Sequence, residues 1–267
     1  MASLADAALD RLEQHGAQRS RGQPFTCDLS VEELSAIEDS GFAPLRLVMG
    51  SCVYQMGWQW VGWTEAKEVD VLSTAMYASR ERAVRLMKGE AARAGADGVV
   101  GVHIDIDFGR WGEGLAEFTA IGTAVAYRAK PGSFRTPVGE VFTSDLAGQD
   151  LWALLRSGHR PLGLVMGCCV YHYPAQGLAK WFSNLRQNAE LEGLTAAFYS
   201  AREAAMDRMQ KEALGLGSLG VVGVNISERS HAWGGHTIEF LALGTAVRSL
   251  DQESSSPKPQ MVRKLNA

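Results

Sequence analysis

Apolar and polar residues follow two different periods along this chain, and each period predicts one kind of element. Between residues 65 and 93, apolar positions recur at spacings of three, four or seven among strong helix formers, which predicts an amphipathic helix. Between Val99 and Asp107 the apolar residues fall on the even positions and His103, Asp105 and Asp107 on the odd ones. Such strict alternation predicts a strand with one buried and one polar face. The runs 45–54 and 116–127 predict two further strands, the second apolar on both faces.

The same order of elements occurs twice. Leu45–Tyr54 recurs 117 residues later as Leu162–Tyr171, with eight of ten positions identical. Beyond the start of the helix the spacing becomes 122 residues, so that Tyr77 aligns with Tyr199, Arg80 with Arg202 and Trp111 with Trp233. The sequence therefore predicts two tandem copies of one β-α-β-β unit, an α+β fold in which a helix covers one face of each small sheet.

Turn and capping signals divide the chain further. Ser30 and Glu33 form the pattern of a capping box, which predicts a short helix that ends at Gly41. A stretch with two prolines and glycine predicts a linker. We expect an N-terminal arm, two units joined by the linker, and a disordered tail rich in serine and proline: residues 1–24, 25–128, 129–140, 141–250 and 251–267.

One helix hides only one face of a three-stranded sheet, yet the closing strands at 116–127 and 238–247 are apolar on both faces. We therefore expect the second face to pack against another sheet, in the sister unit, in a neighbouring subunit, or in both. Because apolar patches of this size are uncommon on monomers, the pattern predicts a closed homo-oligomer.

Composition narrows the classes of partner. The 267 residues are 46% hydrophobic and 21% charged. The net charge of −4 and the lack of a basic stripe argue against binding of nucleic acid. No apolar run approaches the roughly 18 residues that span a bilayer, and the N-terminus lacks the pattern of a signal peptide. Four cysteines are too few for a secreted disulfide framework. We expect a cytoplasmic protein.

Two groups of residues are candidates for binding a metal ion. Cys52 and Cys169 occupy equivalent strand positions and could contribute thiolates to a soft-metal site assembled between subunits, although buried cysteine is more often structural. His103, Asp105 and Asp107 place an imidazole and two carboxylates on one strand face, a set that suits a divalent ion. The alternative for this second group is a solvated or pore-lining polar face.

An aromatic segment is the candidate for a partner or a flat ligand. Trp58, Trp60 and Trp63 lie between the first strand and the helix, and indoles supply large contact areas with a polar edge. Packing into an oligomer interface would use the same residues. No Ser-His-Asp, Cys-His or paired-carboxylate arrangement recurs in both copies, so we expect no enzymatic activity.

The glycine-flanked strand carries a resemblance. Residues 90–105 read Glu-Ala-Ala-Arg-Ala-Gly-Ala-Asp-Gly-Val-Val-Gly-Val-His-Ile-Asp, and Gly-Thr-Ala-Val follows at 122–125. This pattern resembles the YbjQ-like family of small bacterial proteins, over residues 44–127 and 161–248. The second copy departs from it at Ser218 and Leu219. The resemblance implies that the chain is a tandem member with dodecin-like units. It also implies assembly into rings, which are commonly pentamers in this family, and the family is described as heavy-metal-binding.

Two functions follow as hypotheses. The first is a ring-forming, non-enzymatic homo-oligomer, expected to be five-fold, that binds a small ligand or a divalent transition metal at its domain interfaces. The alternative is a structural or adaptor assembly that docks another protein through the tryptophan-rich segment and the N-terminal arm.

Overall fold

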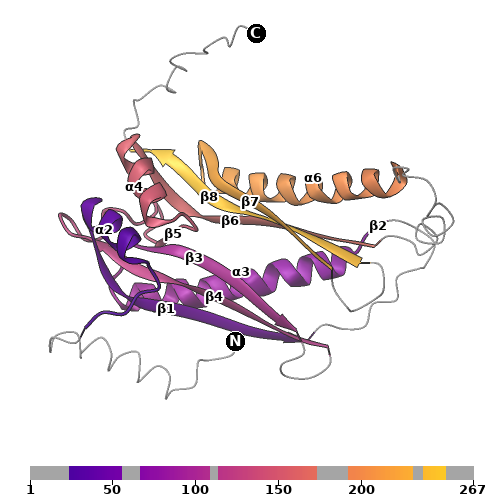
Figure 1. The fold of residues 1–267 in the computed structure, drawn as a ribbon, viewed down its shortest axis with the longest axis horizontal. Coiled ribbons are helices and arrows are strands. Elements are labelled where there is room, and N and C mark those ends of the chain that lie inside the picture. Colours follow the sequence, from indigo (N-terminus) through magenta and orange to yellow (C-terminus); the bar gives the residue numbers. More distant parts are fainter. Residues whose placement is uncertain (1–23, 56–66, 109–113, 173–191, 231–236, 251–267) are drawn as a thin grey trace, which may run out of the picture.

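The computed structural model describes residues 24–55, 67–108, 114–172, 192–230 and 237–250 (Figure 1). Three expectations lie outside these residues: the N-terminal arm up to residue 23, the disordered tail after residue 250, and the roles of Trp58, Trp60 and Trp63. The described residues hold two sheets, which we call sheet A and sheet B, each packed with a long helix. The predicted α+β class with two tandem units is confirmed.

The strands and helices repeat in the two halves of the chain. The first half contains α2 (Val31–Asp39), β1 (Phe42–Gln55), β2 (Lys67–Glu68), α3 (Asp70–Arg93), β3 (Gly98–Phe108) and β4 (Leu115–Tyr127). The second half contains β5 (Phe142–Thr143), α4 (Gly148–Arg156), β6 (His159–His172), α6 (Glu192–Gly215), β7 (Gly220–Ser230) and β8 (Thr237–Ser249). The strand order is β1-β4-β3-β5 in sheet A and β2-β6-β8-β7 in sheet B.

Each sheet contains one short strand from the other half of the chain. Strand β5 pairs in parallel with β3 of sheet A, where Phe142 lies opposite Gly98. Strand β2 pairs with the end of β6 in sheet B. The long helix was expected to begin near residue 65, but α3 begins at Asp70 because residues 67–68 are used in this pairing. The two units are therefore joined by exchanged strands as well as by the linker.

The capping box predicted at Ser30 is present. The Ser30 hydroxyl accepts from the Glu33 N–H at 3.2 Å, and the Glu33 carboxylate accepts from the Ser30 N–H at 2.8 Å. The chain then leaves α2 through Gly41 at φ +83°. The second half forms the equivalent helix α4 without a side-chain cap, since Ala147 occupies the capping position. This helix was not predicted because its start signal is missing; buried Leu151 and packing against α2 hold it in place.

The predicted alternation of β3 is wrong at its start. Gly101 adopts φ +64° and forms a bulge between Val100 and His103. A bulge inserts one residue and shifts the faces of the strand by one position. As a result Val99, and not Val100, shares the core beneath α3 with Val102. The second unit repeats the bulge at Gly223 with φ +66°.

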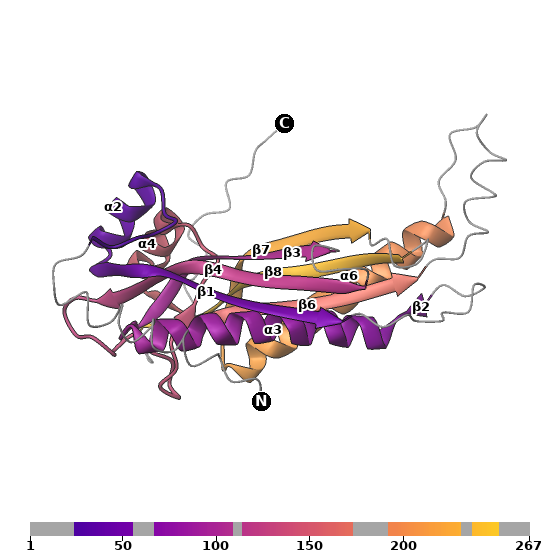
Figure 2. The same cartoon turned by 90° about the horizontal axis from the view of Figure 1, so that it is seen from below.

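Four layers follow one another in the order sheet A, α3, sheet B, α6. Helix α3 packs on β1 and β4 of its own sheet and also on β6, while α6 packs on β6 and β8 (Figures 1 and 2). One core therefore joins both units: Met76 and Met87 of α3 and Phe118 of sheet A share it with Met166 and Cys168 of sheet B. The second face of sheet B was expected to meet another sheet. This face of sheet B meets α3 of the first unit instead, because only one side of α3 is used to cover sheet A.

Each helix lies almost against the backbone of its strand. A Cβ atom added at Gly50 would lie 2.1 Å from the Ala83 carbonyl oxygen, and one at Gly167 would lie 1.9 Å from that of Ala205. The two glycines thus allow the same close approach of helix and strand at equivalent positions of both units.

Candidate assembly interface

The contact between α3 and sheet B is the most informative interface of the molecule. We call it the inter-unit interface. It contains alternate residues of β6 and β8 together with one face of α3. Successive strand residues point to opposite faces, so Cys168 faces α3 whereas Cys169 packs in the core beneath α6. The interface is lined by Ser73, Tyr77 and Arg80 of α3 and by Leu164, Met166, Cys168, Val170, Glu239, Leu241 and Leu243 of sheet B.

A buried ion pair lies at its centre. Arg80 Nη2 is 2.6 Å from Glu239 Oε1, and both side chains are fully buried. The Arg80 guanidinium also lies 5.7 Å from the centroid of the Phe118 ring, so it contacts both sheets. The Cys168 thiol donates to Glu239 at 3.0 Å. Removing either charge would leave the other desolvated without compensation, which makes this pair sensitive to mutation.

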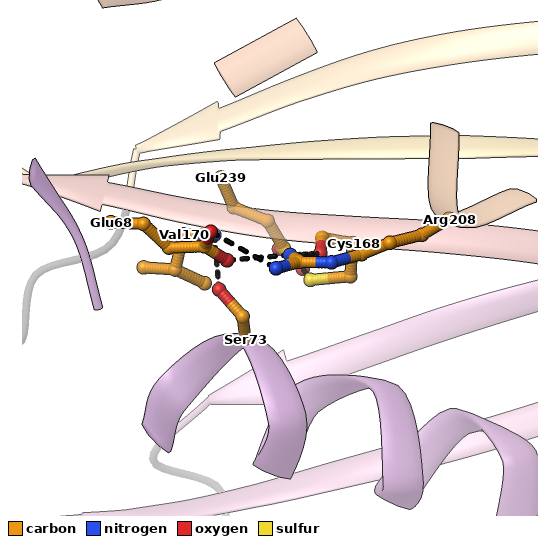
Figure 3. Close-up of polar contacts among 6 residues, drawn as sticks. All are labelled: Glu68, Ser73, Cys168, Val170, Arg208 and Glu239. Carbon is orange, nitrogen blue, oxygen red and sulfur yellow. Dashed lines mark hydrogen bonds and ion pairs between the residues drawn. The ribbon is translucent and has the colours of Figure 1, made fainter. Parts of the chain in front are cut away.

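Side chains from both helices bind the backbone of β6 at its edge (Figure 3). The Ser73 hydroxyl accepts from the Val170 N–H at 2.8 Å. From the other side, Arg208 of α6 donates to the Cys168 carbonyl oxygen and, at 3.0 Å, to the Glu68 carboxylate. Burial would raise the pKa of Glu68, but the hydrogen bonds and charge of Arg208 outweigh it and lower that pKa. The unpaired edge of β6 is thereby satisfied from two layers.

Tyr77 and Glu212 close the interface beside this edge. The Glu212 carboxylate accepts from the Met166 N–H at 2.8 Å and interacts with the Tyr77 hydroxyl. Burial is the main cause that raises the pKa of Glu212. Burial, followed by the negative charge of Glu212, raises the pKa of the Tyr77 hydroxyl well above its usual value. This contact therefore links α3 of the first unit to α6 of the second.

Sheet A has an equivalent face that no described element covers. We call it the outer face: Leu47, Met49, Ser51, Val53, Glu117, Thr119 and Ile121. These positions align with the residues of sheet B that α3 covers. Leu47, Met49 and Val53 are 37%, 52% and 49% exposed, whereas their counterparts are only 6%, 2% and 1% exposed. The same apolar residues are therefore buried in one unit and exposed in the other.

Polar contacts of the inter-unit interface are also repeated on the outer face. The Ser51 hydroxyl donates to Glu117 at 3.0 Å, as the Cys168 thiol does to Glu239. Glu90 accepts from the Met49 N–H at 2.9 Å, as Glu212 does from the Met166 N–H. The outer face thus repeats these two hydrogen bonds of sheet B. Glu90 additionally accepts at 3.0 Å from Arg46, whose counterpart in the second unit is Gly163.

The exposed face of α6 carries the counterparts of the α3 contact residues. Thr195, Tyr199 and Arg202 align with Ser73, Tyr77 and Arg80. Tyr199 is 55% exposed, and the Arg202 guanidinium lies 4.6 Å from the centroid of its ring. The Arg202 side chain is 40% exposed, whereas that of Arg80 is fully buried. The helix therefore has the residues of an inter-unit interface and no sheet against them among the described residues.

Cys52 and Cys169 lie apart within the chain, in different cores. Cys52 is partly buried in the core beneath α3, whereas Cys169 lies in the separate core beneath α6. Burial, followed by the charge of Glu68, raises the pKa of Cys169 to about 12. Burial and the charge of Glu239 raise the pKa of Cys168 well above its usual value. In both cases burial favours the neutral thiol over the thiolate.

His103, Asp105 and Asp107 are exposed on one side of β3, as the alternation predicted. They lie opposite Ile121, Thr119 and Glu117 and so border the outer face. His103 Nδ1 is 3.8 Å from Asp28 Oδ2. Within the described part of the chain, no group of three or more His, Cys, Asp or Glu side chains is placed to hold a metal ion.

Sequence reasoning missed Arg80, Glu239, Tyr77 and Glu212 as interface residues. The signal was present in the repeat, since the arginine, the tyrosine and both glutamates occur at equivalent positions in the two copies. Glu117 and Glu239 were the clearest part of this signal, because a charged residue at equivalent positions of an otherwise apolar strand needs a polar partner if it is buried.

Two tandem β-α-β-β units that share one core define an α+β protein built by duplication of a dodecin-like unit. A family model described as "Putative heavy-metal-binding" matches residues 65–128 and 139–249. The chain belongs to this family, the YbjQ-like proteins, as the resemblance indicated.

Two relatives extend the comparison. The chain is 46% identical over 247 residues, 92% of each protein, to "Encapsulin nanocompartment protein Rv1762c" of Mycobacterium tuberculosis. It is also 41% identical over 88 residues to a "UPF0145 protein" of Halorubrum lacusprofundi, which covers 33% of this chain and 82% of that protein. The first relative matches both units, whereas the second has the length of one. None of the described helices is both long and apolar enough to cross a bilayer.

Proposed function

We propose that the protein is a non-enzymatic, self-assembling component of the cytoplasm that forms a closed ring of identical chains. The observation that carries this proposal is the outer face of sheet A. Its apolar residues are exposed, although their counterparts in sheet B are buried under a helix. Exposed apolar faces of this kind mark surfaces that bind another protein.

The relatives support an assembly role. A protein that is 46% identical along nearly its whole length is named as a nanocompartment protein. The single-unit length of the second relative supports the view that one unit is the elementary building block. In this chain two such blocks lie on one polypeptide and also share a buried core.

A tandem chain restricts the size of the ring. If every unit contacts the next in the same way, a closed ring contains an even number of units, because each chain contributes two. A ring of five units is then impossible for this protein. The expected five-fold symmetry would require five chains and ten units.

The mass of the native particle tests the assembly. The full-length chain has a mass of 28.9 kDa. We expect light scattering or native mass spectrometry at micromolar concentration to give one discrete multiple of this value. A monomer would overturn the proposal, and a continuous ladder of masses would overturn the closed ring.

We also propose that an assembled particle binds a small ligand or a divalent metal ion at its interfaces. His103, Asp105 and Asp107 supply nitrogen and oxygen donors beside the outer face, where a neighbouring chain could complete a ligand set. Elemental analysis of the intact oligomer should find stoichiometric metal that the Asp105→Asn and Asp107→Asn double variant lacks. An oligomer of full mass without bound metal would overturn this part alone.

A further inference from the structure

We propose that copies of the chain associate head to tail, with α6 of one copy covering the outer face of sheet A of the next. This inference rests on the proposed self-assembly and names its two surfaces. The chain already contains one complete example of this contact, the inter-unit interface between α3 and sheet B. The two surfaces that a second such contact needs are the outer face of sheet A, in the first unit, and the exposed face of α6, in the second unit.

The charged centre of the contact is reproduced. Arg80 pairs with Glu239 at 2.6 Å inside the chain. Their counterparts are Arg202 on the exposed face of α6 and Glu117 on the outer face of sheet A. An α6 placed on the next copy as α3 is placed on sheet B would bring Arg202 to Glu117 of that copy. In the described structure the Arg202 guanidinium lies 2.8 Å from Glu203 and over the Tyr199 ring, both on its own helix.

The contacts at the strand edge are reproduced as well. Tyr77 reaches Glu212, and the corresponding pair is Tyr199 with Glu90 of the next copy. The Ser73 hydroxyl accepts from the Val170 N–H, and the corresponding acceptor is the hydroxyl of Thr195 for Val53 of the next copy. In each case the side chain on α6 keeps the chemistry of its α3 counterpart. Apolar packing is kept too, because Leu47 and Met49 are the same residue types as Leu164 and Met166.

A second, separate element points to the same neighbour. Strand β5 of the second unit pairs with β3 of the first, and the Phe142 N–H donates to the Asp97 carbonyl at 3.1 Å. The counterpart of Phe142 is Phe25, which is 47% exposed whereas Phe142 is fully buried. The counterpart of β3 is β7, the last strand of sheet B in the described residues. Phe25 and Thr26 of the next copy would therefore extend sheet B at β7.

Space for this strand is present at β7. A Cβ added at Gly98 would lie 2.1 Å from the Phe142 ring, while one at Gly220 meets nothing within 4 Å. Helix α6 and strand β7 belong to the second unit, and the outer face and Phe25 belong to the first. Both contacts thus join the second unit of one copy to the first unit of the next. Such an interface is heterologous, and it closes into a ring when its rotation permits.

Charge reversal tests the ion pair. Glu117→Arg alone and Arg202→Glu alone should each raise the dissociation constant between copies by about 100-fold or more, because each places like charges in a desolvated contact. The double variant Glu117→Arg/Arg202→Glu should restore the native mass, since every interface again pairs opposite charges. Circular dichroism of each variant checks that the chain remains folded. Oligomers of full mass in both single variants would overturn the inference while leaving the proposed self-assembly intact.

Two blocked variants test the direction of association. Met49→Asp blocks the outer face and leaves α6 intact, whereas Tyr199→Glu blocks α6 and leaves the outer face intact. Each should be monomeric alone, and their mixture should form a dimer of one chain of each kind that grows no further. Val138→Asp, at an 82% exposed position away from both surfaces, is the matched control and should keep the wild-type mass. A mixture that stays monomeric would overturn head-to-tail association; a monomeric wild type would overturn the proposed function itself.

Discussion

The outer face of sheet A and the α3-covered face of sheet B occupy equivalent positions of the repeat but have opposite surroundings. Met49 and Met166 are equivalent in the repeat, yet one is 52% exposed and the other 2%. Within the described part of the chain, this face of the unit is buried in the second copy and exposed in the first. In a duplicated protein, a contact made inside the chain can therefore serve as a template for a contact between chains. Here the packing of α3 on sheet B indicates which kind of helix would cover sheet A of another copy.

The largest effect should come from breaking the covered copy of the ion pair. Arg80→Met leaves the Glu239 carboxylate buried without its partner and should lower the free energy of unfolding by about 3–5 kcal/mol. Urea denaturation at a fixed protein concentration measures this loss. Arg202→Met is the matched control in the Met49→Asp background, where copies do not associate. A change there is expected within about 0.5 kcal/mol, because the Arg202 side chain is 40% exposed.

A double variant sharpens the same comparison. Replacing Glu239 by glutamine together with Arg80→Met removes both charges and should recover much of the lost stability. Equal losses in the single and double variants would contradict the view that an uncompensated charge causes the effect.

The next effect compares the two ends of the sheets. Gly98→Ala would place a methyl group 2.1 Å from the Phe142 ring, so it should cost about 1–3 kcal/mol of unfolding free energy by overpacking. Gly220→Ala is the substitution at the equivalent position, where the added methyl group meets nothing within 4 Å. It should change the free energy of unfolding little in the Met49→Asp background, in which association is blocked. Equal losses from both substitutions in thermal or urea unfolding would contradict a difference between the two strand edges. In the assembling chain, Gly220→Ala should additionally weaken association.

The sequence predicted the architecture of each unit well because helices and strands depend on local sequence patterns. The helix at 70–93, the three strands of each unit and the capping box at Ser30 all follow from periodicity or caps. The interface could not be predicted in the same way, because it depends on the placement of one unit against the other. Nothing local in the sequence states that α3 packs on two sheets, or that residues 67–68 pair with β6.

Smaller local differences between the units were missed for identifiable reasons. Helix α4 has no capping residue, and the bulge at Gly101 shifts an otherwise regular alternation by one residue. For the candidate metal residues, the pattern correctly placed His103, Asp105 and Asp107 on one face of a strand. It could not show that Cys52 and Cys169 lie in different cores, because equivalent positions in a repeat are related by sequence and not by proximity.

A smaller effect should follow from exchanging the helix caps. Ser30→Ala removes the hydroxyl that accepts from the Glu33 N–H and should cost about 1 kcal/mol. Ala147→Ser introduces a hydroxyl at the extended residue before α4 and should gain about 0.5–1 kcal/mol. Thermal unfolding of the two single variants and of their combination measures both changes. Loss of stability in Ala147→Ser would show that packing against α2, and not the absent cap, determines how α4 begins.

The smallest expected effect concerns pH and tests the contact between Tyr77 and Glu212. Burial, the largest cause, raises the pKa of Glu212 above its ordinary value of 4.5, so the folded chain holds this proton more tightly than the unfolded chain. The stability that this proton contributes is complete below pH 4.5 and is lost as the pH rises through the raised pKa. Glu212→Gln removes the titration and keeps an oxygen that can accept from the Met166 N–H. The urea midpoint of this variant should therefore rise relative to the wild type as the pH increases from about 4 to 7. Gln210→Ala changes α6 without removing a titratable group and should follow the wild type at each pH. Parallel curves for Glu212→Gln and the wild type would show that the carboxyl group is solvated at the inter-unit interface, and its burial there would be wrong.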